Sequence, residues 1–136
     1  MEVLEYLLDA PVRSRQLNDL FAVSWEGHER SNFEPILERS LCYVCAYRGD
    51  ELIGFVNLAW DGGSHAFVLD TTVHPNFRRR GVGRRLVTLA VEAARERGAE
   101  WVHVDFGPHL RGFYIACGFR STEAGLLRLN KPQEGR

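Results

Sequence analysis

Residues 73–86 (Val-His-Pro-Asn-Phe-Arg-Arg-Arg-Gly-Val-Gly-Arg-Arg-Leu) combine the residue types best suited to binding an anion. This stretch joins an expected strand to an expected helix through a loop rich in arginine and glycine. Gly81 and Gly83 lack a Cβ where the chain enters the helix, so a ligand can approach the free backbone N–H groups closely. The helix N-terminus adds about half a positive charge, and the arginines add more. The stretch therefore predicts a cradle for a phosphate or pyrophosphate.

The spacing of the glycines excludes two common phosphate motifs. A dinucleotide-binding fingerprint needs Gly or Ala at position 86, which is Leu, and a Walker loop needs Gly-Lys-Ser/Thr, which is absent. What is present is Arg78-x-x-Gly81-x-Gly83. The arginines could also bind nucleic acid, but the formal net charge of −1, from 17 basic and 18 acidic residues, disfavours that interpretation.

Hydrophobic periodicity and turn residues predict the elements that position this loop. Strands are expected at residues 3–8, 41–47, 51–60, 65–73, 101–106 and 125–130, and helices at 14–23, 33–40, 81–97 and 109–117. The order β-α-α-β-β-β-α-β-α-β is a meander followed by a βαβ unit. We therefore expect an α/β fold with a mixed sheet and helices on its faces. No linker divides the chain, so residues 1–136 are predicted to form a single domain.

In this context the loop resembles the pyrophosphate loop (Gln/Arg-x-x-Gly-x-Gly/Ala) of the GNAT superfamily, the acetyl-CoA-dependent N-acetyltransferases. The segment Phe-Tyr-x-x-Cys-Gly-Phe at 113–119 resembles the family's Phe-Tyr…Gly-Phe signature, and Leu-Ile-Gly-Phe at 52–55 resembles its third strand. The resemblance covers nearly the whole chain. It departs at Gly107, where the family commonly has Asn, so that contact to the cofactor is missing or replaced by His109.

The resemblance implies a transferase that moves the acetyl group of acetyl-CoA to a primary amine by direct attack in a ternary complex. Where the central sheet splays, backbone groups of Thr71, Thr72 and Val73 would meet the acetyl and pantetheine end. The pyrophosphate would lie mainly against main-chain N–H groups of Arg78, Arg79, Arg80, Gly81, Val82, Gly83 and Arg84. Tyr114 would lie near the cofactor sulfur and protonate the departing thiolate.

The attacking amine also needs a general base. A primary amine has a pKa of about 10.4 and is mostly protonated at neutral pH, so it must first lose a proton. Asp70, just before Thr71, is the preferred candidate, with a solvent-bridged structural carboxylate as the alternative interpretation. The rival bases are His65, His74 and His103.

The acceptor itself is not named by the sequence. Trp25, His28 and Trp60 are candidates for lining its pocket, although Trp60 could equally pack in the core. The acceptor is expected to be a small-molecule or peptide amine, and variable loops at 25–32 and 120–124 would shape its site. The resemblance also allows a homodimer. A non-catalytic acyl-CoA sensor of the same fold and an arginine-loop nucleic-acid binder are the alternative functions.

The three cysteines predict neither a metal site nor redox chemistry. Cys42 and Cys45 have the spacing of half a zinc site, but no second pair completes it, and residues three apart on a strand point to opposite faces. With Cys117 they are expected to be free thiols in a reducing cytoplasm. No apolar run approaches the roughly 20 residues that span a bilayer, and residues 1–10 carry acids rather than a signal segment. A membrane or nucleic-acid partner is not expected.

Overall fold

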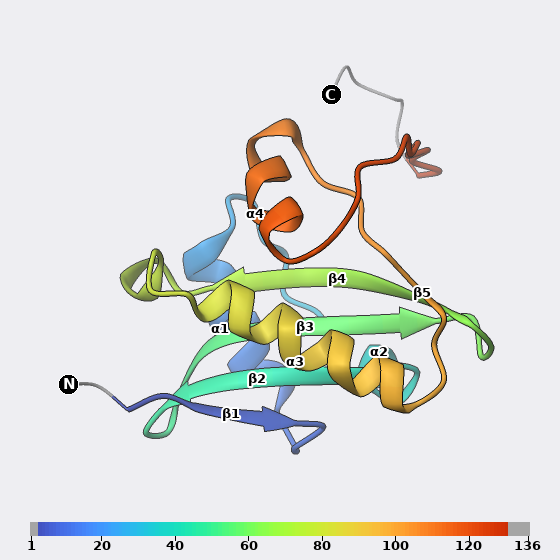
Figure 1. The fold of residues 1–136 in the computed structure, drawn as a ribbon. Helices are drawn as coiled ribbons and strands as arrows, with labels where there is room; N and C mark the ends of the chain where they lie inside the picture. Colours follow the sequence, from blue (N-terminus) through green and yellow to red (C-terminus); the bar gives the residue numbers. More distant parts are fainter. Residues whose placement is uncertain (1–2, 131–136) are drawn as a thin grey trace. The chain divides into compact units, whose positions relative to one another are not determined.

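The computed structural model describes residues 3–130, which fall into two compact units that meet in sequence between Val104 and Asp105. The first unit contains a five-stranded sheet in the order β1-β2-β3-β4-β5 (Figure 1). Its strands are β1 (Glu5–Leu8), β2 (Cys42–Arg48), β3 (Glu51–Trp60), β4 (His65–Val73) and β5 (Trp101–His103). The pairs β1–β2, β2–β3 and β3–β4 are antiparallel and β4–β5 is parallel, which confirms the predicted mixed sheet.

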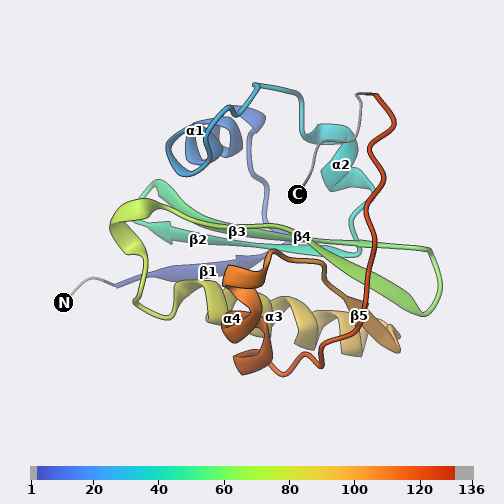
Figure 2. The ribbon, with the colours of Figure 1, turned by 90° about the horizontal axis from the view of Figure 1, so that it is seen from above.

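Helices cover both faces of this sheet. Figure 2 shows α1 (Ser14–Ser24) and α2 (Glu34–Glu38) on one face and α3 (Val82–Glu96) on the other. The core on the α1 side is built from Leu17, Leu20, Phe21, Phe33, Cys45, Leu52 and Phe55. Because apolar residues recur at helical spacing in α1 and at alternate positions in the strands, each element buries one face.

Gly54 allows the start of α3 to pack closely on β3. A Cβ at this position would lie 3.0 Å from Leu86 Cδ1 and 3.2 Å from Val82 Cγ1, closer than ordinary carbon–carbon contact. Both contacts come from the first two turns of α3. The missing side chain at position 54 therefore fixes how near the N-terminus of α3 lies to the sheet.

A β-bulge interrupts β4 near its C-terminal end. Leu69 pairs with Asn57 and Thr72 pairs with Phe55, so two residues of β4, Asp70 and Thr71, lie opposite one residue of β3. Asp70 has a φ of 59°, in the left-handed region that Asp adopts more readily than most residues. The bulge therefore changes the direction of the strand at the predicted catalytic aspartate.

The ladder between β4 and β5 is short. Only residues 65–67 pair with residues 101–103, and within the first unit the rest of β4 has no strand partner on that side among the described residues. Because β5 ends at His103, the predicted strand at 101–106 is shorter than expected. The predicted splay of the central sheet stays a prediction, because β5 ends where its ladder with β4 ends.

The second unit contains the 3₁₀ helix η2 (Pro108–Leu110) and the helix α4 (Arg111–Ala116), which match the helix predicted at 109–117. The predicted last strand at 125–130 is wrong, because these residues pair with no other strand in the described part of the chain. Leu126, Leu127 and Leu129 are exposed. Alternating apolar residues favour an extended segment, but a strand also needs a neighbouring edge for its backbone groups.

Between residues 3 and 130, the helices are too short or too polar to cross a membrane.

Candidate functional site

The loop between β4 and α3 is anchored by the ring of Phe77, in the 3₁₀ helix η1 (Pro75–Phe77), which is 2% exposed. The guanidinium carbons of Arg48 and Arg80 lie 5.0 and 5.1 Å from the centroid of this ring, at cation–π distance. The ring of His74 meets it edge-on at 5.8 Å. These contacts hold the loop against the sheet, and they place the Arg80 guanidinium beside an aromatic face.

Arg78 joins this loop to α1. Its Nε donates to the Val73 carbonyl at 3.3 Å, and one terminal nitrogen donates to the Ser24 carbonyl at 3.4 Å. Ser24 is the last residue of α1, and the C-terminal end of a helix favours a positive charge. The Arg78 guanidinium thus braces α1 against the end of β4, a role that the sequence did not suggest.

The start of α3 is open. Arg79 and Gly81 have φ values of 62° and 78°, and a Cβ at Gly81 would meet no atom within 4 Å. The first backbone hydrogen bond of the helix runs from the Arg85 N–H to the Gly81 carbonyl at 3.0 Å. The N–H groups before this bond point out of the helix end; they belong to Val82, Gly83 and Arg84.

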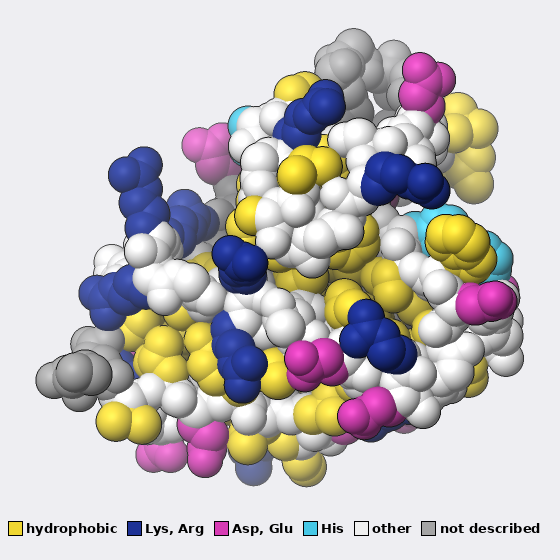
Figure 3. Space-filling view, in the orientation of Figure 1, with side chains coloured by type: hydrophobic (Ala, Val, Ile, Leu, Met, Phe, Trp, Pro, Cys, Tyr) yellow, Lys and Arg dark blue, Asp and Glu magenta, His cyan; other side chains and the backbone are white. Residues whose placement is uncertain are grey.

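Arginine side chains surround this open end. In Figure 3, dark-blue side chains project at the left of the molecule, where Figure 1 shows the loop between β4 and α3. Arg78, Arg79, Arg80 and Arg84 are all exposed, whereas the side chain of Val82 is buried. The residues of the predicted anion cradle are therefore brought together at the N-terminus of a fifteen-residue helix.

The bulge of β4 lies directly before this loop. Thr72 is 3% exposed and its Oγ1 donates to the Asp70 carbonyl at 2.9 Å, which stabilises the bulged backbone. The Asp70 side chain is exposed, yet the surrounding protein desolvates it enough to raise the pKa of its carboxyl, while the charge of His28 acts to lower it. A carboxyl with a raised pKa accepts a proton more readily than an ordinary Asp.

Two of the three predicted acceptor-pocket residues lie together. The rings of Trp25 and His28 are 5.9 Å apart, and both contact the ring of Phe21. Trp60 lies elsewhere, at the end of β3, where it pairs with Ala66 and is 40% exposed. Since Phe21 contacts Phe55, five residues earlier on β3, Trp60 lies roughly 16 Å further along the strand.

Asn18 organises the segment that carries His28, and sequence reasoning missed it. It is 4% exposed, and its amide contacts Ser14, His28 and Ser31. The signal was present, because position 18 falls on the apolar face of α1 beside Leu17 and Phe21. A polar residue on a buried face must find hydrogen-bond partners.

The rival histidines do not surround Asp70. His65 Nδ1 and His103 Nε2 lie 2.7 Å apart, so these two side chains bind each other at the start of β4 and on β5. His65 is five residues, or roughly 16 Å along the strand, from Asp70. His74 accepts a hydrogen bond from the Asn76 N–H at 3.1 Å and forms part of the loop.

Tyr114 lies on α4 in the second unit. It is buried, and its ring contacts Phe106, Phe113 and Phe119, with centroids 5.1, 4.9 and 5.8 Å away. In the same unit, a Cβ at Gly107 would lie 2.9 Å from Cε1 of His109. The His109 ring therefore occupies the space that a side chain at position 107 would need.

Cys42 and Cys45 are buried on opposite faces of the sheet, as predicted. The Cys42 thiol points toward α3, 3.6 Å from the Ala90 carbonyl, and Cys45 lies in the core on the α1 side. Burial raises the pKa of Cys42 to about 11 and that of Cys45 to about 12, so both remain thiols at neutral pH. Residues 3–130 contain no cluster of three or more His, Cys, Asp or Glu side chains placed to hold a metal.

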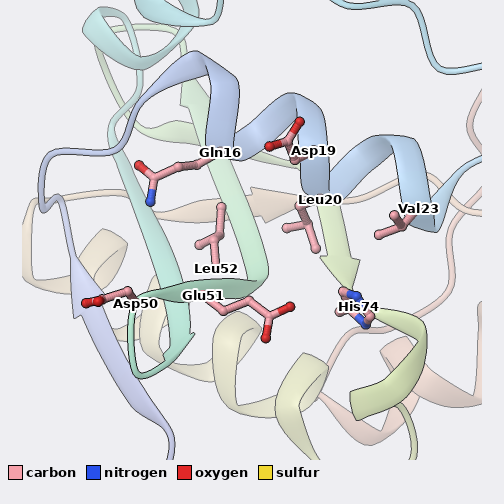
Figure 4. Close-up of a pocket in the computed structure, with 8 residues that line it drawn as sticks. All are labelled: Gln16, Asp19, Leu20, Val23, Asp50, Glu51, Leu52 and His74. Carbon is pink, nitrogen blue, oxygen red and sulfur yellow. The ribbon is translucent and has the colours of Figure 1, made fainter.

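A recess of about 300 Å³ lies between α1 and the turn from β2 to β3 (Figure 4). Asp50, Glu51 and Leu52 line it from the turn, and His74 from the end of β4. The α1 side is lined by Gln16, Asp19, Leu20 and Val23. None of the residues predicted to bind acetyl-CoA or the acceptor lines this recess.

Comparison with known proteins assigns the family. Residues 7–119 match the model of the acetyltransferase (GNAT) family, and the chain therefore belongs to that family. It is 33% identical over 90 residues to an uncharacterized N-acetyltransferase of Bacillus subtilis, a match that covers 64% of this chain and 57% of that protein. The chain thus spans little more than half the length of this relative. The predicted acyltransferase class is confirmed at the level of the family.

Solved structures share the fold. A GNAT family acetyltransferase from Streptococcus pneumoniae has a TM-score of 0.74 and 26% identity, covering 96% of this chain and 100% of that one. The aminoglycoside N-acetyltransferase AAC(6')-Iy, solved in complex with CoA, has a TM-score of 0.74 and 18% identity, covering 97% of each chain.

Proposed function

We propose that residues 1–136 act as one N-acetyltransferase domain, which transfers the acetyl group of acetyl-CoA to a primary amine in a ternary complex. The observation that carries the proposal is the open N-terminus of α3, with Gly81 in the left-handed region and exposed arginines around it. Family membership and the CoA complex of AAC(6')-Iy support acetyl-CoA as the ligand of this loop.

The cofactor would use main-chain groups more than side chains. The N–H groups at Val82, Gly83 and Arg84 suit a pyrophosphate, because they combine hydrogen-bond donors with the positive end of the helix dipole. Arg79 and Arg84 add positive charge from exposed side chains. The acetyl and pantetheine end would lie along Thr71, Thr72 and Val73, where β4 has passed the end of β5.

The chemistry is a direct acyl transfer. The ammonium of the acceptor gives a proton to a general base, Asp70 or a group that acts with it, and the freed lone pair attacks the thioester carbon. A backbone N–H near the bulge stabilises the tetrahedral oxyanion. The carbon–sulfur bond then breaks, and the thiolate takes a proton from the hydroxyl of Tyr114. No covalent acyl-enzyme forms, so the buried thiols of Cys42 and Cys45 need no part in it.

The acceptor is proposed to be a small-molecule or peptide amine bound near Trp25 and His28. Trp60 remains a weaker candidate, because it lies further along β3 than the residues that contact Phe21. We also propose that the protein is a homodimer, which light scattering of the purified protein would test. A cytoplasmic location is a further proposal. Neither a metal ion nor nucleic acid is part of the proposal.

Two measurements test this function. Acetyl-CoA at a hundred times its dissociation constant should stabilise the fold by about 2.7 kcal/mol, whereas NADH and ATP should stabilise it much less. Equal thermal shifts for the three ligands would reduce the loop to a general anion site.

A screen of thiol release from acetyl-CoA over aminoglycosides, polyamines, amino acids, arylalkylamines and peptides then identifies the acceptor. Binding of acetyl-CoA without thiol release from any amine would favour a non-catalytic acyl-CoA sensor.

A further inference from the structure

The side-chain amide of Asn18 has a defined orientation. The backbone N–H of Ser31 can only donate, and it lies 3.0 Å from Asn18 Oδ1. The carbonyls of Ser14 and Ser31 can only accept, and each lies 2.8 Å from Asn18 Nδ2. These three contacts assign the oxygen and nitrogen of the buried amide without reference to any histidine.

This orientation determines the tautomer of His28. Its Nε2 lies 2.9 Å from Asn18 Oδ1, an oxygen that can only accept a hydrogen bond. Nε2 therefore carries a proton, and in the neutral imidazole the lone pair lies on Nδ1. A histidine with one nitrogen bound as a donor and the other left as an acceptor is arranged to take up a proton.

Aromatic side chains from α1 and from the segment between α1 and α2 hold the imidazole ring. Phe21 and Trp25 meet it edge-on at 5.5 and 5.9 Å, and Phe33 lies nearly parallel to it at 6.5 Å. His28 is half-buried, so the ring is held and yet remains accessible. Its position is set by packing as well as by Asn18, as a group that must meet a substrate requires.

Charged groups lie on several of the elements around His28. Desolvation raises the pKa of the Asp70 carboxyl at the β4 bulge, and the charge of His28 acts to lower it. Other charged groups around His28 include the exposed Glu26 and Glu29, Arg30 paired with Asp19 at 3.1 Å, and Arg78 at the end of α1. The helices α1 and α2 also carry the exposed Arg15, Glu34 and Glu38.

We propose that His28 is the catalytic base and that Asn18 is the positioning residue that holds its tautomer. An N–H bond of the acceptor ammonium breaks as Nδ1 of His28 takes the proton, and the imidazolium later releases that proton to water. This assignment rests on the proposed acetyl transfer. It adds to it the identity of the group that receives the proton.

The test replaces His28 by Gln, whose Nε2 can still donate to Asn18 Oδ1 but which cannot take up a proton at neutral pH. We expect kcat/KM for the amine to fall roughly 10²–10⁴-fold at pH 7, with an unchanged dissociation constant for acetyl-CoA. The rate of the wild-type protein should fall as the pH is lowered through about 8 to 5, the range in which histidine side chains take up a proton. H28Q should not show this fall.

His65→Gln is the matched control, because it removes another imidazole of the same unit and should leave the pH profile unchanged. An H28Q protein with the wild-type rate and profile would overturn the proposal while leaving acetyl transfer intact. Absence of thiol release from every amine would instead count against the proposed function.

A measurement on the unmodified protein does not depend on activity. Nitrogen-15 NMR of the histidines should show that neutral His28 carries its proton on Nε2 and none on Nδ1. The opposite tautomer would refute the role of Asn18 and with it the proposal.

Discussion

At the scale of single residues, the site depends on groups whose surroundings differ from those of ordinary surface residues. Asp70 combines a left-handed backbone with a carboxyl whose pKa is raised by desolvation. Tyr114 is packed among three aromatic rings. Both environments can be tested by changes that keep the shape of the side chain and remove one chemical property.

Replacing Tyr114 by Phe should leave the ring contacts and the affinity for acetyl-CoA in place. If the hydroxyl protonates the departing thiolate, kcat should fall roughly 10²–10⁴-fold while KM changes little. The loss should lie at the lower end, because a thiol has a pKa of only about 8.5 and water can partly replace the donor. Steady-state kinetics on the true acceptor, with a melting curve as control, checks this. A folded Y114F protein with the wild-type kcat would mean that Tyr114 lines the pocket and takes no part in the proton transfer.

Replacing Asp70 by Asn should make the fold slightly more stable at neutral pH. Because the folded protein raises the pKa of this carboxyl, the folded state binds its proton more tightly than the unfolded chain does. Stability from this group is therefore present at low pH and is lost as the pH rises through the interval between the unfolded pKa and the higher folded value. Asn carries no such charge and also tolerates the left-handed conformation.

Denaturant unfolding of wild type and D70N at pH 7 and near pH 3 measures this difference. The gap in unfolding free energy should be small, favour D70N at pH 7, and shrink at pH 3. A larger stability for wild type at pH 7 would mean that the carboxylate makes a net stabilising contact.

At the scale of elements, two glycines determine where α3 begins and how closely it packs. Gly81 supplies a left-handed residue before the helix, and Gly54 removes the side chain under its first turns. One acts on the shape of the loop and the other on the distance between helix and sheet. Adding a side chain at each of the two positions should therefore have different effects on ligand binding and stability.

Replacing Gly81 by Ala should cost about 1 kcal/mol of stability, because φ is positive there, and should weaken acetyl-CoA binding. Gly49→Ala is the matched control: its φ of 57° is also left-handed, and its Cβ too would meet no atom within 4 Å. Calorimetry should find weaker binding only in G81A. Equal dissociation constants for the two variants would place the cofactor away from this loop.

Replacing Gly54 by Ala should destabilise the fold by about 1–3 kcal/mol, because the new methyl group would press on Leu86 and Val82 in a closely packed core. Gly125→Ala serves as control, since its φ is not positive and its Cβ would meet nothing within 4 Å. Thermal unfolding of both variants checks this, and a G54A protein as stable as G125A would show that α3 can shift without cost.

At the scale of the whole molecule, the candidate site residues are divided between the two compact units. Asp70 and the α3 N-terminus belong to the first, and Tyr114 to the second. The cysteines offer a probe of this division, because Cys42 and Cys45 are buried with raised pKa values and Cys117, in the second unit, is half-buried.

Alkylation by iodoacetamide should therefore modify Cys117 much faster than the other two thiols, as read by mass spectrometry. If acetyl-CoA uses both units, a saturating thiol-free analogue such as desulfo-CoA should slow this reaction several-fold. ATP at the same concentration is the control. An unchanged rate with desulfo-CoA would restrict the ligand to the first unit.

Much of the fold follows from local patterns. The strands of the meander and helices α1 and α3 were predicted within a few residues, because hydrophobic period and turn residues are local properties. The loop and helix start at 78–84 were predicted for the same reason, whereas their binding of an anion stays a prediction. The last strand was wrong, since residues 125–130 have the pattern of a strand but no neighbouring edge. Pairing is a property of two segments, and one segment cannot reveal it.

The details of the site depended on such distant contacts. The bulge at Asp70 arises from the register between β3 and β4, and Arg78 reaches the end of α1, 54 residues away in sequence. The sequence shows Asn18 only as a polar residue on the apolar face of α1. It does not show which groups bind the Asn18 amide. The departure at Gly107 was visible in the sequence, but only the structure places the ring of His109 beside it.

The arginine composition of the cradle has a consequence for the enzyme's own integrity. A thioester held beside lysine side chains could acylate them, since an unprotonated amine is a nucleophile. The cradle instead contains five arginines between positions 78 and 85, and the whole chain has a single lysine, Lys131. A guanidinium stays protonated at any physiological pH and has no lone pair to offer. The side chains proposed to attract the phosphates of the cofactor are therefore ones that acetyl transfer cannot consume.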